Sequence, residues 1–186
     1  MVIVILSIII LLLVFLLWAV FTSNNLIAKR NRVKQCKSSI CVVLKQRNDL
    51  IPNLVASVKT YMGHENEVLT RIAELRSKVS AASENEQIKS GTEISSLLAR
   101  LQIAVEDYPE LKANEQFQNL QWQMVDMENE IQAIRRTYNS AVTDYNNSIE
   151  MFPSSIIASW RRHEKQELIA FPESEMKAVK VGDLFK

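Results

Sequence analysis

The sequence predicts an all-α protein, in which an N-terminal transmembrane helix precedes an up-down antiparallel four-helix bundle with long first and last helices. Three observations carry this prediction. The chain opens with an apolar run, its other apolar residues recur at helical spacing, and it has only 3 glycines in 186 residues. So few glycines disfavour tight β-turns and exclude the glycine-rich loops that bind phosphates.

The apolar run predicts a membrane anchor over residues 1–23. Residues 2–21 are apolar apart from Ser7, and no charge appears before Lys29. A helix of this length covers the ~30 Å hydrocarbon core of a bilayer at ~1.5 Å per residue. A cleaved signal peptide is the alternative, but the basic start and the small-residue cleavage site are both missing. We therefore expect a retained single span.

Basic residues beside the span predict its orientation. Before the run stands only Met1, and after it come Lys29, Arg30, Arg32, Lys34 and Lys37. By the positive-inside rule, the N-terminus lies outside and the C-terminal bundle lies in the cytoplasm.

The composition of the rest restricts the class of protein. With 22 basic and 21 acidic residues, the chain lacks the positive surplus of a nucleic-acid-binding protein. Cys36 and Cys41 lie five residues apart on a predicted helix, so they face different directions and stay reduced in a cytoplasmic setting.

The first long helix is predicted over residues 24–62. Pro52 falls inside it and should bend the helix rather than end it, because the apolar stripe resumes in register. Gly63 should end the helix as the C′ residue. The apolar positions recur at threes, fours and sevens: Leu26, Val33, Ile40, Leu44, Ile51, Leu54, Val58 and Tyr61.

Two shorter helices follow. The first fades through the polar stretch 80–91, and the second begins after Ser90 or Thr92 as N-cap and stops at Pro109. Their apolar positions are Val68, Ile72, Leu75 and Val79 in the first, and Ile94, Leu98, Leu101, Val105 and Tyr108 in the second.

The last helix, over about residues 111–151, has the strongest pattern, and Pro153 ends it. Five heptads with apolar a and d positions are typical of coiled-coil-like packing and complete the bundle over residues 24–152. These positions are Phe117, Leu120, Met124, Met127, Ile131, Ile134, Tyr138, Ala141, Tyr145 and Phe152, with Ser148 as the one polar member.

A series of motifs resembles the LemA family from the anchor to about Ile157. They are RNDLIPNLV at 47–55 with VKTY at 58–61 and HE at 64–65, EDYPELKAN at 106–114, ENEI at 128–131, RRTYN at 135–139, YN at 145–146 and FPS at 152–154. After Ala158 the chain departs from the family's glycine- and phenylalanine-rich continuation and reads SWRRH. The resemblance implies a bacterial inner-membrane protein with one N-terminal span, a small external N-terminus and a four-helix cytoplasmic bundle. It implies no catalytic activity and no cofactor, and some relatives help to build magnetosome membranes.

Helix lengths predict an interaction surface near the membrane. The first and last helices are each about 60 Å long and the middle two are half as long, so four helices can pack only in the membrane-distal half. In the proximal half, Ile131, Ile134, Tyr138, Tyr145 and Ile149 face Val33 and Ile40 across two helices, which leaves part of the stripe wet. Such patches mark contacts, so we expect a homo-oligomer or contact with another membrane protein. Alternatively, the polar stretch 80–91 folds down and covers the stripe.

The C-terminal segment, residues 153–186, returns to the bilayer surface by the same counting. Ile156, Ile157 and Trp160 precede Arg161, Arg162 and Lys165, a composition that suits a short helix in contact with membrane lipid at the level of the headgroups. An ordinary helix packed on the bundle is the alternative. Beyond Phe171 and Pro172 we expect a loosely ordered tail.

No set of residues predicts catalysis, a metal site or a small-molecule substrate. His64 and His163 stand far apart, and HENEV at 64–68 lacks the second histidine of a zinc protease. The inward Glu-x-x-His pairs of a di-iron bundle are absent. His64 follows Gly63 at a helix junction, so a capping role is expected, with a phosphotransfer histidine as the alternative.

The polar motif residues are predicted to fix the register of the bundle. Arg47 falls at the level of Asp126 and Glu128, which predicts an ion pair between helices whose charge-swapped double variant should recover stability. Similar register or capping roles are expected for Asp49, Pro52, Asn53, Asn114, Tyr138, Asn139, Tyr145 and Asn146. The alternative is a ligand or partner groove around the two Tyr-Asn pairs.

Two functions therefore compete. The first is a membrane-anchored scaffold that organises the membrane or its complexes through self-association. The second is a tethered adaptor or signalling module that docks a cytoplasmic partner. An enzyme is disfavoured because no nucleophile has an evident base.

Overall fold

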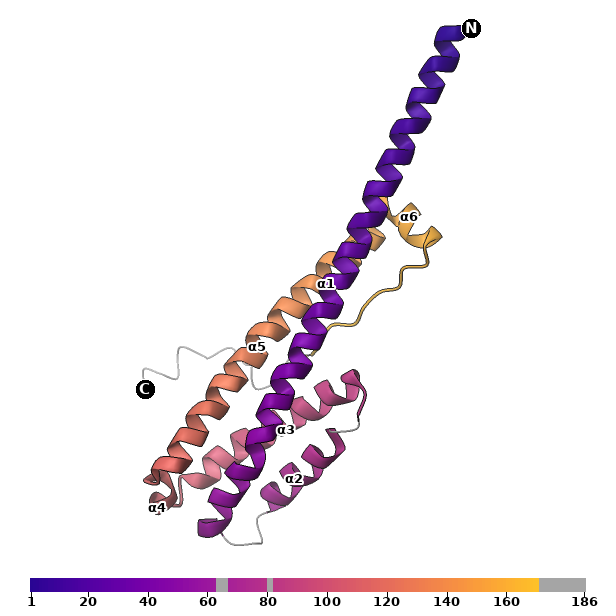
Figure 1. Ribbon diagram of the computed structural model, residues 1–186. Helices are drawn as coiled ribbons and strands as arrows, with labels where there is room; N and C mark the ends of the chain where they lie inside the picture. The colour runs from indigo at the N-terminus through magenta and orange to yellow at the C-terminus, as the bar shows by residue number, and fades with distance from the viewer. Residues whose placement is uncertain (63–66, 80–81, 171–186) are drawn as a thin grey trace, which may run out of the picture. The chain divides into compact units, whose positions relative to one another are not determined.

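The computed structural model describes residues 1–62, 67–79 and 82–170, and the helices in these ranges confirm the all-α prediction. Figure 1 shows their course. The helices are α1 (Val2–Met62), α2 (Glu67–Val79), α3 (Glu84–Val105), α4 (Pro109–Lys112), α5 (Glu115–Glu150) and α6 (Ser154–Trp160). The chain divides into two compact units, which are described separately. Unit 1 comprises Met1–Lys37 and Arg135–Ile169, and unit 2 comprises Ser38–Ile134 with the residues from Ala170 onward.

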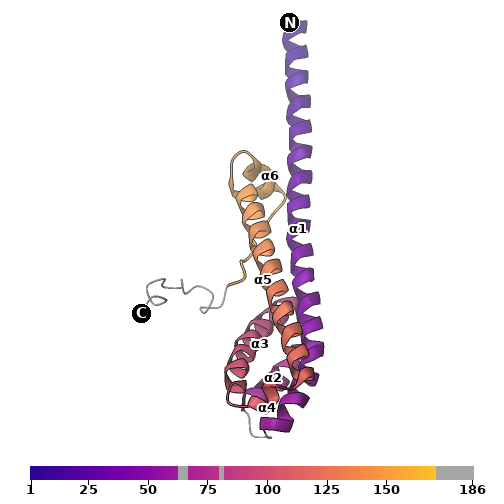
Figure 2. The same ribbon diagram turned by 90° about the vertical axis from the view of Figure 1, so that its left-hand side faces the viewer.

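Helix α1 joins the predicted anchor and the first predicted bundle helix without a break. Pro52 lies inside it, and the helix continues for ten residues to Met62, as predicted from the register of the apolar stripe. The N-terminal part is long and apolar enough to cross a membrane. None of its most apolar stretch is buried by the rest of the described chain. In Figure 2 this part of α1 stands alone.

Unit 2 has one apolar core to which five helices contribute. Figures 1 and 2 both show α2 and α3 beside the C-terminal half of α1, with the short α4 leading from α3 into α5. The core residues are Ile51, Leu54 and Val58 of α1, Leu69, Ile72 and Leu75 of α2, Ile94, Leu97, Leu101 and Val105 of α3, Leu111 of α4, and Phe117 and Met124 of α5.

The start of α3 corrects the sequence prediction. The helix begins at Glu84 with Ser83 as N-cap, and the Ser83 backbone N–H and hydroxyl both donate to the Glu86 carboxylate, at 2.9 and 2.7 Å. The predicted caps Ser90 and Thr92 are wrong, because both lie inside the helix. The Ser-x-x-Glu signal of a capping box was present at residues 83–86.

The junction between α3 and α5 is also more finely divided than predicted. Helix α3 ends at Val105, and Pro109 occupies the first turn of the separate helix α4, where its missing N–H costs no hydrogen bond. The last long helix therefore begins at Glu115 instead of residue 111. Asn114 caps it, as predicted, by accepting a hydrogen bond from the Phe117 N–H at 3.0 Å.

Most of the apolar stripe is buried, with Ile134 half-buried, which corrects the predicted exposed surface. Tyr138, Val142 and Tyr145 of α5 and Leu26 and Val33 of α1, all in unit 1, are at most 5% exposed. Ile149 is also buried, as are Ile131 and Ile40 in unit 2. The argument for self-association from an uncovered stripe is therefore removed.

The alternative cover, a polar loop over residues 80–91, is wrong as well. Residues 84–91 form the first turns of α3. Residues 163–169, for which the sequence predicted no contact with α5, instead lie on this helix in unit 1.

Candidate functional site

Two asparagines of α5 hold an extended segment of the chain in unit 1. The Asn146 amide group donates to the Gln166 carbonyl and accepts from the Gln166 N–H, at 2.9 and 3.0 Å. The Asn139 amide makes the same pair of bonds with Ile169, both at 2.9 Å. Each asparagine thus binds both the backbone N–H and the backbone carbonyl of one residue. We call residues His163–Ile169 the return segment.

The neighbouring tyrosines bind the same segment. The Tyr138 hydroxyl donates to the Glu167 carbonyl at 3.0 Å, and the Tyr145 hydroxyl lies 3.0 Å from His163 Nδ1. Burial raises the pKa of both tyrosines, so each stays a neutral hydroxyl. The four residues Tyr138, Asn139, Tyr145 and Asn146 form one surface, which we call the Tyr–Asn face.

The titratable side chain of His163, in the return segment, contacts Tyr145 of the Tyr–Asn face. Its ring centroid lies 5.9 Å from that of Tyr145. Desolvation lowers its pKa first, and the positive charges of Arg30 and Arg161 lower it further. In neutral His163, an unprotonated Nδ1 can accept a hydrogen bond from the Tyr145 hydroxyl.

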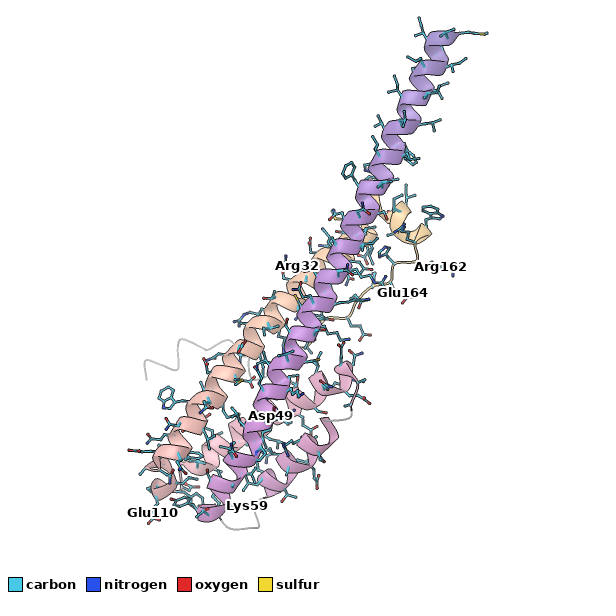
Figure 3. All side chains as sticks on the ribbon, viewed as in Figure 1. Arg32, Asp49, Lys59, Glu110, Arg162 and Glu164 are labelled. Carbon is cyan, nitrogen blue, oxygen red and sulfur yellow. The ribbon has the colours of Figure 1, made fainter. Side chains whose placement is uncertain are left out.

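A helix cap directs the return segment away from α6. The His163 N–H donates to the Ala158 carbonyl at 2.9 Å and the Arg162 N–H to the Ser159 carbonyl at 3.1 Å, which is the hydrogen-bond pattern of a Schellman motif. Arg162 occupies the C′ position with φ of 52°, a place that favours glycine. Figure 3 shows Arg162 and Glu164 at this turn.

The predicted membrane-facing residues lie on this same turn. Trp160 is 80% exposed, and Arg161 and Arg162 are exposed beside it. Ile157 and Ala158, on the other side of α6, are buried. The helix therefore has one face packed and one face available.

In unit 2, Arg47 forms the predicted ion pair with Glu128. The distance from Arg47 Nη1 to Glu128 Oε2 is 2.8 Å, and the Arg47 side chain is fully buried. The guanidinium also donates to the Ser95 hydroxyl at 2.6 Å and to the Gly91 carbonyl at 2.8 Å. One side chain of α1 therefore ties α3 and α5 together.

The other predicted positions on α1 lie at the surface of unit 2. Asp49, Pro52 and Asn53 are exposed. Asp49 lines a polar hollow with Lys45 and Arg76, among others. The register role predicted for these three residues stays a prediction.

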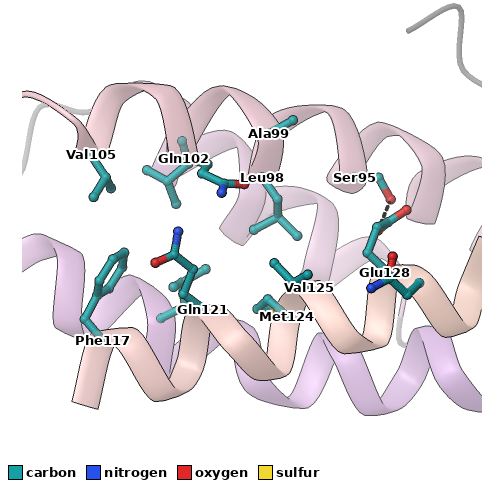
Figure 4. A pocket seen from close by; sticks show the side chains of 13 residues that line it. Ser95, Leu98, Ala99, Gln102, Val105, Phe117, Gln121, Met124, Val125 and Glu128 are labelled. Carbon is teal, nitrogen blue, oxygen red and sulfur yellow. Dashed lines mark hydrogen bonds between the residues drawn. The ribbon is translucent and has the colours of Figure 1, made fainter. Parts of the chain in front are cut away.

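An apolar groove between α3 and α5 was missed from the sequence. Figure 4 shows Leu98, Gln102 and Val105 of α3 facing Phe117, Gln121 and Val125 of α5 across a hollow of about 190 Å³. Ser95 and Glu128 close one end, joined by a hydrogen bond of 2.8 Å. The large apolar residues Ile103 and Trp122 fall outside the predicted stripes and are exposed, but neither lines the groove.

The described residues hold no group of three or more His, Cys, Asp or Glu side chains that could bind a metal. His64, for which a capping or phosphotransfer role was weighed, lies outside the described residues.

Comparisons with known proteins follow the motifs. The family model described as LemA family matches residues 36–182. The chain is also similar to Protein LemA of Metamycoplasma hominis, with 28% identity over 160 residues that cover 85% of this chain and 72% of that protein.

Proposed function

Because the chain belongs to the LemA family, we propose that it is a membrane-anchored helical interaction protein that binds another protein at the apolar groove between α3 and α5. The bacterial inner membrane is the proposed location, with the N-terminus outside and the bundle in the cytoplasm. The apolar N-terminal part of α1 supports the anchor, and the five basic residues that follow it support the orientation. We propose no catalytic role.

Exposed apolar residues in the groove and one helical turn from it carry this proposal. Val125 lines the groove, and Trp122 lies one helical turn before it on α5. On α3, Ile103 lies one turn after Ala99, which also lines the groove. Trp122 and Ile103 are each 73% exposed and Val125 is 40% exposed. Aromatic and aliphatic anchors around a hollow are typical of protein-binding surfaces.

The polar groups in the groove favour a protein occupant over a lipid chain. Gln102 and Gln121 face the hollow in Figure 4, and Asn129 lines it as well. Their amides can bind the backbone or polar side chains of an amphipathic segment, whereas an acyl chain would leave them without partners.

A scaffold that self-associates is the second candidate. The same exposed apolar residues favour it too, because those of two copies can bury one another around a two-fold axis. The partner in this case is a second copy of the chain, and tethering in one bilayer raises its local concentration.

Photocrosslinking in cells tests both candidates. A photoreactive phenylalanine derivative replaces Val125, which lines the groove, in the full chain, and the matched control carries it at Glu130, an exposed residue about 140° round α5 from Val125. Products identified by mass spectrometry as a different protein support the adaptor, and products of two copies support the scaffold. Equal crosslinking from both positions, or none from Val125, contradicts a docking role for the groove.

A second experiment tests the proposed lipid contact of α6. The chain has 3 tryptophans, at positions 18, 122 and 160, so the Trp18→Phe/Trp122→Phe variant reports on Trp160 alone. Brominated lipids should quench its fluorescence if Trp160 lies at the headgroup level. The matched control keeps only Trp122. Equal quenching of both variants would argue for α6 as an ordinary packed helix.

A further inference from the structure

The Tyr–Asn face has the geometry of a repeating peptide-binding site. Asn139 and Asn146 lie seven residues apart on α5, and their partners Ile169 and Gln166 lie three residues apart in the return segment. Seven residues of helix span about 10.5 Å, and three extended residues span about 10 Å. One heptad of helix therefore matches three residues of an extended chain that runs antiparallel to it.

The hydrogen bonds from Tyr138, Asn139 and Asn146 go to backbone atoms of the return segment, not to its side chains. Both asparagines bind only N–H and C=O groups of the return segment, and Tyr138 binds the Glu167 carbonyl. Between the two anchor points, Glu167 and Leu168 are exposed, the latter by 58%. The site therefore selects an extended polypeptide with few demands on its sequence.

Two side-chain contacts add modest selectivity. His163 bonds Tyr145 at one end of the segment, and Lys165 forms an ion pair with Glu150. Ile169 is half-buried at the other end. An extended segment with a histidine, a basic residue and a terminal aliphatic residue at these spacings meets every contact.

We propose that the Tyr–Asn face is a binding site for an extended peptide, and that it accepts the return segment of a second copy of the chain in exchange for its own. A second copy supplies the segment whose fit the structure shows bond by bond. The exchange makes no new type of contact, which makes it a low-cost route to an oligomer. This site does not depend on the groove between α3 and α5.

A binding measurement with the full chain in detergent micelles tests the site. The Gln166→Pro/Ile169→Pro variant removes the two N–H donors of the return segment and so frees both asparagines. The probe is a fluorescent peptide with the sequence of residues 161–170. We expect saturable binding to this variant, and at least tenfold weaker binding to the unaltered chain, whose own segment competes at high effective concentration.

Matched controls distinguish recognition of the peptide backbone from nonspecific binding of the peptide. Adding Asn139→Leu and Asn146→Leu to the proline variant should abolish binding, as should proline at the same two positions of the peptide. Alanine at peptide positions 164, 167 and 168 should change affinity less than threefold. Circular dichroism verifies that each variant keeps its helices. A folded proline variant that does not bind the peptide, or binding that survives the two leucines, overturns the site.

Exchange between copies is tested in membranes without the proline variant. Two differently tagged full chains are coexpressed, and one carries a photoreactive side chain at Leu168. Crosslinks between the two tags are expected, and they should disappear when the other copy carries Asn139→Leu/Asn146→Leu. Crosslinks found only within one chain overturn the exchange, whatever the result of crosslinking from Val125.

Discussion

The buried guanidinium of Arg47 lies 2.8 Å from the Glu128 carboxylate, and the two side chains hold three helices of unit 2 in register. The same Glu128 oxygen accepts a hydrogen bond from the Ser95 hydroxyl at 2.8 Å, so the charge is shared among partners on α1, α3 and α5. Removing one partner of such a pair leaves a buried charge, which costs far more than removing both.

Glu128→Ala should therefore destabilise the protein by about 3–5 kcal/mol. The double variant Arg47→Met/Glu128→Leu should recover most of this loss, because neither charge remains. The measurement is chemical unfolding in micelles followed by circular dichroism, with exposed Glu130→Ala as a control of small effect. A loss below about 1 kcal/mol for Glu128→Ala would remove the structural role of the pair.

The charge-swapped variant Arg47→Glu/Glu128→Arg should restore only part of the lost stability. A carboxylate at position 47 would face the Gly91 carbonyl oxygen, which now accepts from Arg47 at 2.8 Å. Two acceptors without a donor between them repel each other. Full recovery in the same unfolding assay would show that the Gly91 contact contributes little.

Gly91 lets α3 approach α1 closely, and a larger residue should separate them. A Cβ on Gly91 would lie 2.6 Å from Leu44 Cδ2, and Leu44 is only 2% exposed. Overpacking costs about 1–3 kcal/mol, and the better helix propensity of alanine returns up to about 1 kcal/mol. Gly91→Ala should thus lower stability slightly, and Leu44→Ala should cost less in the Gly91→Ala background than alone. Additive effects in this double-mutant cycle would argue against the close approach.

Acid should release the return segment. The pKa of His163 is lowered in the folded protein, so the free segment takes up a proton first. The contribution of His163 to binding is therefore full above its ordinary value of 6.5 and is lost as the pH falls through the lower folded value. Arg30 and Arg161 oppose the imidazolium, and the Tyr145 hydroxyl must then reverse its role. The protection of the Gln166 and Ile169 amides against hydrogen exchange, taken relative to the intrinsic exchange rate at each pH, should fall over this range in the unaltered chain and not in His163→Gln. Unchanged protection in the unaltered chain would remove the pH dependence.

The end of α6 can be stabilised by one substitution. Arg162 has φ of 52°, a conformation that costs a residue with a Cβ roughly 1–2 kcal/mol and glycine almost nothing. Arg162→Gly should slow hydrogen exchange at the His163 amide, which donates to Ala158. Arg162→Ala is the matched control and should give no such gain. Faster exchange in the glycine variant would contradict the cap.

Periodicity alone predicted most of the fold. The positions Leu26, Ile40, Ile51 and Val58 are buried as their spacing requires, and α1 continues past Pro52 because the stripe stays in register. The first turns of α3 were missed because residues 84–91 carry few apolar side chains, while the Ser83 and Glu86 pair that starts them is a local hydrogen-bond signal. Apolar spacing does not detect such caps.

The partners of the candidate sites were predictable only in part. Arg47 and Glu128 could be matched because both sit on long helices, where position follows from counting residues. The partners of Asn139 and Asn146 are backbone atoms of an extended segment, and backbone atoms have no signature in a sequence. The groove was missed because a stripe of buried residues predicts where helices pack together and not where they leave a hollow between them.

The continuous helix α1 restricts which molecules can bind to unit 1. Only about 7.5 Å of helix separates Phe21, the last residue of the apolar run, from Leu26, the first buried apolar residue of this unit. Because α1 is continuous here, no flexible linker separates this residue from the apolar run. With the apolar run in the bilayer, as proposed, any molecule that replaces the return segment must bind close to the lipid surface, which favours partners that are themselves bound to the membrane.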